Sequence, residues 1–304
     1  MISSAMIETI QGYVPAVNIY LQEPMAQHTT FRIGGPAECV IEMENAVQVA
    51  KLQRYLRQVE YPFTVVGNGS NLLVSDKGYQ GIVLLIGKKM SEITVEGTRI
   101  RAQAGATMAQ AAAAALKHGL TGLEFASGIP GTLGGGVVMN AGAYGGELAQ
   151  VVREVQVVNG EGEELCLDNE TMEFGYRRSI LRKKPFTVTE VTMELQPGDA
   201  AQIKDKMDKL AAKRREKQPL QFPSAGSTFK RPEGYYAGEL IMKAGMRGFQ
   251  IGGARVSDKH CGFVVNMGNA TAADVRDVIC EVQSRVKECF GVELEPEVVF
   301  LGDF

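Results

Sequence analysis

Twenty residues near the middle of the chain hold the densest set of groups that could bind an anion. The stretch 127–146 reads SGIPGTLGGGVVMNAGAYGG, and eight of its residues are glycine. Glycine adopts positive φ and lets the backbone approach a ligand closely, and successive backbone N–H groups in such turns form concave nests that bind anions. The stretch is therefore either a cradle for a phosphate-containing cofactor or a set of tight turns in a β-rich domain.

A second glycine loop, at 67–71, directly follows a β-branched segment that we expect to be a strand. A strand, a glycine loop and an apolar segment in this order suggest phosphate binding, but the dinucleotide fingerprint requires a third glycine where this chain has Leu72. The fingerprint also requires a carboxylate about 20 residues further on, and residues 87–90 supply none. A nucleotide contact and a plain turn both remain open here.

Two adjacent arginines, Arg177 and Arg178, follow an aromatic residue in the segment FGYRRS. Arginine binds carboxylates and phosphates through two parallel hydrogen bonds, so the pair could form an anion clamp. A surface ion pair with Glu170 or Glu173 is the alternative.

Proton transfer needs an acid or a base near the reacting atom, and the chain offers few candidates. Ser227 lies in a polar turn without a neighbouring base, and no G-x-S-x-G segment marks a hydrolase nucleophile. His260 lies in a glycine-rich segment, where we expect a structural, hydrogen-bonded histidine. Glu293, Glu295 and Glu297 alternate in an expected C-terminal strand and would share one face, where a glutamate turned into a cleft would be a candidate acid.

Helices and strands must bring these groups together. Apolar residues three or four positions apart predict a helix that Asn45 caps and that ends at Tyr61-Pro62. Thr107 could cap a helix over 107–118, and Thr271 begins the last helix with a segment that resembles a capping box. The other expected elements are helices over 201–217 and 236–244, a hairpin over 93–102, a short strand ending at 167, and strands over 31–33, 39–43, 63–66, 81–86, 151–158, 186–195 and 292–300.

The composition is that of a soluble globular protein of two or three domains, with 304 residues, 45% of them hydrophobic and 22% charged. A net charge of −3 gives no footprint for nucleic-acid binding. Five cysteines without C-x-x-C spacing favour reduced thiols, and three scattered histidines argue against a metal site. Because neither a leader segment nor an apolar run of about 18 residues is visible, we expect a cytoplasmic protein without membrane insertion.

The chain contains, in order, the segments TTFRIGGPAE, VVGNGSNLLV, SGIPGTLGGGVVMNAGAYGGE, FGYRRS, KQPLQFPSAGSTFKRP, IGGARVSDKHCGFVVN and LEPEV. Together they resemble the UDP-N-acetylenolpyruvoylglucosamine reductase family from about residue 29 to residue 301. The resemblance implies an α+β fold, with a two-lobed, vanillyl-alcohol-oxidase-like FAD-binding domain followed by an α/β substrate-binding domain. We expect the N-terminal segment and lobe 1 at 1–88, lobe 2 at 89–200 and the substrate-binding domain at 201–304.

The resemblance also implies a reaction. An NADPH-dependent flavoenzyme would reduce the enolpyruvyl group of UDP-N-acetylglucosamine enolpyruvate to UDP-N-acetylmuramate in peptidoglycan precursor synthesis. NADPH would reduce FAD, and the reduced flavin would pass the hydride on. Arg177 and Glu297 would stabilise the charge that develops toward the carboxylate, and Ser227 would protonate the α carbon.

Particular residues are expected at the ligands on the same grounds. Substrate contacts would come from Tyr176, Lys217 and Arg231, although the basic end of the helix at 201–217 is by itself typical of a solvated face. Cofactor contacts would come from Gly67, Asn68, Gly69, Ser70, Asn71, Ser127, Gly128, Ile129, Pro130, Gly131, Thr132, Gly134, Asn140, Gly142 and Ala143.

Two departures from the family pattern and two alternative functions stay open. The run from Phe174 to Leu195 leaves no room for the inserted tyrosine loop of one branch, so we assign the shorter branch, and Arg231 stands where some members have Asn. The alternatives are an FAD-dependent oxidase with the same flavin-binding fold and a catalytically silent flavin-binding protein. The glycine loops carry no His or Cys that could tether flavin covalently, and we expect a monomer.

Overall fold

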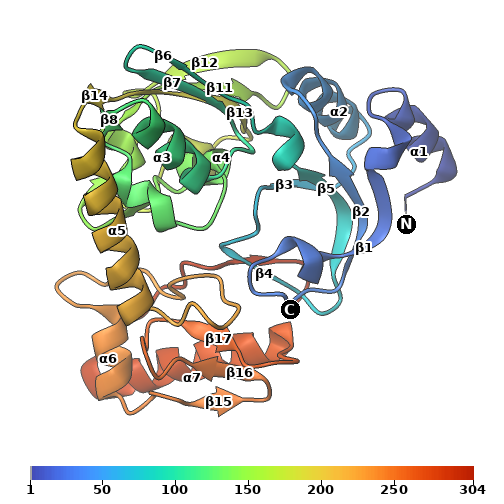
Figure 1. Ribbon diagram of the computed structural model, residues 1–304. Helices are drawn as coiled ribbons and strands as arrows, with labels where there is room; N and C mark the ends of the chain where they lie inside the picture. Colours follow the sequence, from blue (N-terminus) through green and yellow to red (C-terminus); the bar gives the residue numbers. More distant parts are fainter. Residues whose placement is uncertain (1) are drawn as a thin grey trace. The chain divides into compact units, whose positions relative to one another are not determined.

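The computed structural model describes residues 2–304 and mixes helices and strands along the chain, as an α+β fold requires (Figure 1). The chain folds into two compact units, each assembled from three segments. Unit 1 comprises Met1–Leu21, Cys39–Asn68 and Gly81–Lys213, and unit 2 comprises Gln22–Glu38, Gly69–Gln80 and Arg214–Phe304.

A five-stranded antiparallel sheet in unit 1 has the strand order β12-β11-β13-β7-β6. A register shift between Val152 and Glu154 interrupts the alternation of β11, after which Val155 and Val157 share the buried face. The hairpin predicted over 93–102 is confirmed as the pair β6–β7. The strands are β6 (Ile93–Glu96), β7 (Arg99–Gln103), β11 (Val152–Val158), β12 (Glu164–Asp168) and β13 (Thr187–Glu194).

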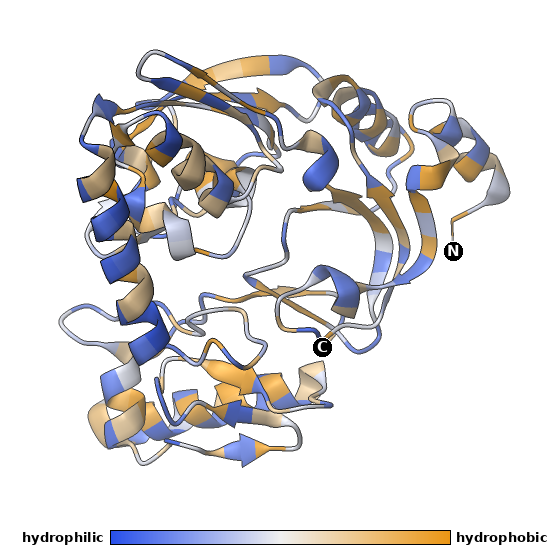
Figure 2. Ribbon diagram, in the orientation of Figure 1, coloured by the Kyte–Doolittle hydropathy of each residue, from blue (hydrophilic) through white to orange (hydrophobic). Residues whose placement is uncertain are grey.

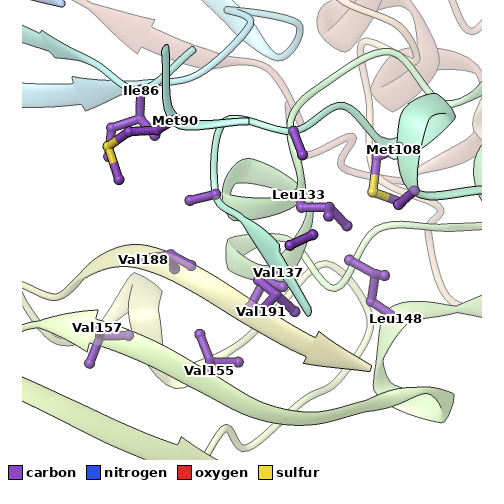
Figure 3. Close-up of a cluster of buried hydrophobic side chains, with 14 of the residues drawn as sticks. Ile86, Met90, Met108, Leu133, Val137, Leu148, Val155, Val157, Val188 and Val191 are labelled. Atoms are coloured by element: carbon purple, nitrogen blue, oxygen red, sulfur yellow. The ribbon is translucent and has the colours of Figure 1, made fainter. Parts of the chain in front are cut away.

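Helices α3 (Met108–Lys117) and α4 (Leu133–Val138) pack against this sheet. Figure 3 shows Val137 of α4 beside Val191 of β13, and Leu133 of α4 belongs to the same buried apolar cluster. The predicted start of α3 is confirmed, because Thr107 and Gln110 form a reciprocal capping box.

A second sheet has the strand order β1-β2-β5-β3, and its β3–β5 pair is parallel. The predicted cap of α2 is confirmed, since the Asn45 side chain accepts a hydrogen bond from the backbone N–H of Gln48 at 2.9 Å. The boundaries between the two units fall within β1, β2 and β5. The elements are α1 (Ser4–Gln11), α2 (Ala46–Gln58), β1 (Ile19–Pro24), β2 (Pro36–Glu42), β3 (Phe63–Val66) and β5 (Tyr79–Leu85).

Unit 2 has its own apolar core, built around α7 (Ala272–Phe290). The predicted apolar face of α7 is confirmed, because Val275, Val278 and Val282 are fully buried. The helix starts at the Thr271 capping box and ends at Gly291, whose φ is +68°. The other elements are α6 (Ala237–Lys243), the antiparallel strands β15 (Gln250–Ile251), β16 (Ala254–Val256) and β17 (Val264–Asn266), and the parallel pair β4 (Leu72–Val74) and β18 (Val299–Leu301).

Helix α5 (Ala200–Lys217) begins in unit 1 and ends in unit 2. Figure 2 shows that most of its residues are hydrophilic, as expected for a solvated helix. The remaining short elements are the strands β8 (Leu120–Thr121), β9 (Gly142–Ala143), β10 (Gly146–Glu147) and β14 (Gln196–Pro197), and the 3-10 helices η1 (Ala16–Asn18), η2 (Met25–His28), η3 (Lys88–Met90), η4 (Glu124–Gly128), η5 (Leu148–Gln150) and η6 (Ile180–Arg182).

Two predicted strands were wrong. Residues 31–33 form a turn, because Arg32 has φ +55° and the Thr29 hydroxyl donates to the carbonyl of Ile33 at 3.0 Å. The C-terminal strand is Val299–Leu301, so only its first two residues fall within the expected range 292–300. Pro296 lacks a backbone N–H for ladder pairing, so the segment before Val299 forms only an isolated bridge.

The glycine stretch is also more regular than a series of turns, because α4 forms inside it. Three consecutive glycines would disfavour a helix by themselves. A Cβ on Gly134 would lie 2.9 Å from the Cβ of Ala104, so the helix can pack this closely only with glycine. Close packing of α4 within unit 1 therefore outweighs the low helix propensity of glycine.

Candidate active site

The two predicted glycine loops meet within unit 1. A Cβ on Gly67 would lie 2.3 Å from the hydroxyl oxygen of Thr132, so the Gly67 backbone packs against the Thr132 side chain more closely than any side chain at position 67 would permit. Thr132 itself is buried, and its hydroxyl accepts a hydrogen bond from the backbone N–H of Gly135 at 3.3 Å, which caps α4.

The remainder of the first loop, from Gly69 to Asn71, belongs to unit 2. Gly69 has φ +57°, and a Cβ there would lie 2.0 Å from the backbone oxygen of His28. The Asn71 side-chain amide donates to the backbone carbonyl of Glu297 at 3.0 Å. The Asn71 amide nitrogen is thus engaged with the segment that carries the candidate acid.

Asn140 is almost completely buried, and both ends of its side-chain amide are engaged. Its nitrogen donates to the carbonyl of Gly175 at 3.1 Å, and its oxygen accepts from the backbone N–H of Ala149 at 2.9 Å. Asn140 therefore ties the end of the glycine stretch to the turn that carries Arg177.

Arg177 lies in a tight turn with φ +52°, closed by backbone hydrogen bonds between Gly175 and Arg178. Its guanidinium carbon lies 5.1 Å from the centre of the Tyr176 ring, and its Nη2 atom donates to the carbonyl of Gly142 at 3.5 Å. Glu173, a candidate ion-pair partner, instead pairs with Lys183 at 3.0 Å. These contacts leave Arg177 oriented by an aromatic ring and by the glycine stretch.

Ser227 and Glu297 lie on neighbouring segments of unit 2. The backbone N–H of Glu297 donates to the carbonyl of Thr228 at 2.8 Å, and Phe229 forms an antiparallel bridge with Pro296. Thr228 is buried, and its hydroxyl accepts from the backbone N–H of Val264 at 2.9 Å. Ser227 is therefore an exposed residue whose chain neighbours are firmly anchored.

The three alternating glutamates do not share one environment, because most of the expected strand is absent. Glu295 pairs with Lys230, and Glu293 pairs with Lys287 at 2.7 Å. The hydrogen bond and the charge of Lys287 lower the pKa of Glu293. Both residues are exposed, whereas Glu297 is partly buried.

The expected substrate residues are exposed side chains. Tyr176 has 56% of its surface exposed, and Lys217 is the last residue of α5. Arg231 lies 4.1 Å from the centre of the Tyr236 ring and donates from Nε to the carbonyl of Tyr235 at 3.3 Å. Sequence analysis did not predict that Tyr235 and Tyr236 orient Arg231. The only signal in the sequence is that the three residues lie within six positions of one another.

His260 has the structural environment that we expected. Its Nδ1 accepts from the backbone N–H of Gly262 at 3.1 Å, and its ring meets Phe263 edge to face at 5.0 Å. Burial lowers its pKa, so the ring is neutral at neutral pH. Among residues 2–304, no group of three His, Cys, Asp or Glu side chains could hold a metal ion. No helix in the same range has the length and apolar character needed to cross a membrane.

Comparisons with known proteins identify matches along most of the chain. Residues 37–168 match the FAD binding domain, and residues 218–301 match the UDP-N-acetylenolpyruvoylglucosamine reductase C-terminal domain. The UDP-N-acetylenolpyruvoylglucosamine reductase of Caldanaerobacter subterraneus is 50% identical over 98% of both chains. The Clostridium perfringens reductase is 50% identical over 94% of this chain and 93% of its own.

Solved structures support the same relationship. The crystal structure of UDP-N-acetylenolpyruvylglucosamine reductase from Thermus caldophilus matches with a TM-score of 0.80 and 34% identity, and covers 93% of this chain and 98% of that chain. An alkyldihydroxyacetonephosphate synthase matches with a TM-score of 0.51 at 12% identity, over 65% of this chain and 41% of that chain, and so shares only the fold.

Proposed function

We propose that Arg177, Ser227 and Glu297 stabilise the developing charge and supply the proton in the reaction of this chain. The chain belongs to the UDP-N-acetylenolpyruvoylglucosamine reductase family. The chain is an oxidoreductase that reduces the enolpyruvyl group of UDP-N-acetylglucosamine enolpyruvate to give UDP-N-acetylmuramate for peptidoglycan synthesis. It is a flavoprotein whose cofactor is FAD.

The residues around the glycine loops fit a dinucleotide. The Gly67 backbone packs against the Thr132 side chain and leaves no room for a Cβ. Glycine turns of this kind can present backbone N–H groups to a diphosphate. We propose that the predicted residues at 67–71 and at 127–143 hold FAD. Because the Asn71 and Asn140 side chains bond to the protein, we assign their contacts to backbone atoms.

Arg177 suits the carboxylate of the enolpyruvyl group. When bound and reduced by NADPH, FAD would supply the hydride. Arg177 would then face the negative charge that develops toward the carboxylate. A guanidinium pairs with a carboxylate through two parallel hydrogen bonds. Stacking on Tyr176 restricts the guanidinium before the substrate arrives, so less side-chain freedom is lost on binding.

Ser227 is our candidate for the proton donor and Glu297 for the neighbouring acid. A serine hydroxyl is a weak acid, so it must be held within about 3 Å of the α carbon. The buried flanking residue Thr228 restrains the backbone that carries it. Glu297 in its protonated form would donate a hydrogen bond to the developing charge.

The observation that carries this assignment is the hydrogen bond from the backbone N–H of Glu297 to the carbonyl of Thr228. It joins segments that are far apart in the sequence and brings two of the three proposed residues to adjacent positions. Lys217, Tyr176 and Arg231 are proposed to bind the nucleotide sugar, since each is exposed. Tyr176 forms a cation–π pair with Arg177, and Arg231 forms one with Tyr236.

A visible spectrum of the purified, FAD-loaded protein tests the function. Under anaerobic conditions the flavin band should bleach on addition of NADPH and return on addition of UDP-N-acetylglucosamine enolpyruvate. A parallel titration with NADH compares NADPH and NADH as reductants of the flavin. A bleached band that returns only with oxygen would support the oxidase alternative, and failure to take up FAD would contradict both functions.

We also propose domain limits, a cellular location and an oligomeric state. The FAD-binding match at 37–168 covers part of each proposed lobe, 1–88 and 89–200. The second match lies within the proposed substrate domain 201–304. A cytoplasmic location is supported by five cysteines that are all free thiols. Sedimentation would test the proposed monomer.

A further inference from the structure

A buried carboxylate lies immediately before the second glycine loop. Glu124 is only 3% exposed, yet it has three hydrogen-bond donors. The Thr121 hydroxyl donates at 2.5 Å, the backbone N–H of Gly122 at 3.2 Å and the Lys206 ammonium group at 3.2 Å. Burial by itself raises the pKa of Glu124, but the hydrogen bonds from Thr121 and Lys206 and the charge of Lys206 outweigh it and lower the pKa.

The backbone of Glu124 fixes the loop that follows. Glu124 is the first residue of η4, and its carbonyl accepts a hydrogen bond from the Ser127 hydroxyl at 2.9 Å. The next two residues, Phe125 and Ala126, are buried. The carbonyl of Ala126 accepts from the backbone N–H of Ile129 at 3.0 Å. The position of Glu124 therefore determines where the segment from Ser127 to Ile129 lies.

The partner of Glu124 lies on α5, within the part of this helix that belongs to unit 1. The start of α5 is held to the same region, because β14 pairs with β8 and the backbone N–H of Gly198 donates to the carbonyl of Gly119 at 2.8 Å. The pair Lys209–Asp205 on α5, in contrast, links two exposed residues of the helix surface. The Lys206–Glu124 pair joins α5 to η4 and involves a buried charge.

We propose that Glu124 is a positioning residue for the FAD diphosphate loop at 127–132, with Lys206 and Thr121 holding its carboxylate. This inference rests on the proposed role of that loop in binding FAD. Removing the largely exposed Lys206 leaves the buried Glu124 charge uncompensated. A glutamine at position 124 keeps only one acceptor oxygen for the three donors. The loop would then shift, and its N–H groups would no longer converge on the diphosphate.

FAD affinity, measured by flavin fluorescence on the FAD-free protein, tests the proposal. Glu124→Gln preserves the shape but not the charge, and we expect its Kd for FAD to rise at least about tenfold, or about 1.4 kcal/mol. Lys206→Met should weaken FAD binding, and Lys206→Arg, which retains the charge, should restore it. The Glu124→Gln, Lys206→Met double variant should be no weaker than Glu124→Gln alone, because the two residues act as one unit.

Lys209→Met is the matched control, since it removes an exposed ion pair from the same helix and should leave the Kd unchanged. Thermal unfolding of each FAD-free variant separates folding from binding. An unchanged Kd in folded Glu124→Gln, whatever its melting temperature, would overturn the proposal. Should Glu124→Gln fail to fold, equal FAD binding by Lys206→Met and the unaltered chain would overturn it instead. If the unaltered chain binds no FAD, the proposed function itself fails.

Discussion

The side-chain amide of Asn71 donates a hydrogen bond to the backbone carbonyl of Glu297 at 3.0 Å. The backbone N–H of Val299 returns a hydrogen bond to the carbonyl of Asn71 at 2.9 Å, where the parallel pair β4–β18 begins. The end of the first glycine loop and the segment of the proposed catalytic acid are thus one hydrogen-bonded structure within unit 2.

Asn71→Asp tests whether this contact positions Glu297. The substitution keeps the size of the side chain but replaces the N–H donor with an oxygen that faces a carbonyl. We expect reduction of the enolpyruvyl substrate to slow about tenfold, because a partly buried acceptor loses its partner, while reduction of the flavin by NADPH is unchanged. Stopped-flow measurement of the two half-reactions distinguishes them.

Asn45→Asp provides the control for this substitution. The Asn45 side chain accepts a hydrogen bond at the start of α2, and an aspartate can do the same. Both half-reactions should keep their rates. If Asn71→Asp also has normal rates, the contact with Asn71 does not position Glu297.

Ser227→Ala should separate proton donation from flavin chemistry. We expect normal flavin reduction by NADPH and a loss of about 100-fold or more in substrate reduction, which is the scale for a positioned acid. Ser284→Ala, at an exposed position of α7, is the control. Full substrate turnover in Ser227→Ala would exclude this hydroxyl as the proton donor.

Gly67→Ala should disrupt the junction of the two glycine loops. The new Cβ would lie 2.3 Å from the Thr132 hydroxyl oxygen, so the loops must separate. We expect weaker FAD binding and a loss of about 1–3 kcal/mol in the free energy of unfolding, as is typical of overpacking. Gly87→Ala, where nothing lies within 4 Å of the new Cβ, should leave FAD binding intact. Equal FAD affinities for the two variants would count against a cradle at this junction.

The stability of the protein should depend on pH through His260. Because burial lowers its pKa in the folded chain, the unfolded chain takes up the extra proton at higher pH. The contribution of neutral His260 is therefore complete above about pH 6.5 and is lost as the pH falls through the lowered value. Urea unfolding at several pH values between about 5 and 8 measures this dependence.

His260→Asn should flatten that dependence below about pH 6.5, since an amide oxygen can accept the hydrogen bond from Gly262 without titrating. His118 is exposed at the end of α3, so His118→Asn should retain the full dependence. If unfolding of His260→Asn has the same pH slope as the unaltered chain, another group is responsible.

Elements whose signals lie within a few residues were predictable. The apolar spacing and caps of α2, α3 and α7 depend on neighbours three or four positions apart, and each helix starts at the predicted cap. Prediction failed at residues 31–33 and 292–298, where local alternation suggested strands. A side-chain hydrogen bond from Thr29 and the missing N–H of Pro296 decided those segments instead.

The ordered motifs by themselves determined the family, the FAD cofactor and the reaction, because the residue types of each motif and their order can be read directly from the sequence. Only the tertiary structure decided that glycines form α4, that Asn140 bonds to the turn of Arg177, and that Glu124 pairs with Lys206. Each of these depends on contact between segments that are distant in the chain, and local sequence carries no record of such contacts. The distance between two loops is set by packing, which forms only when the whole unit folds.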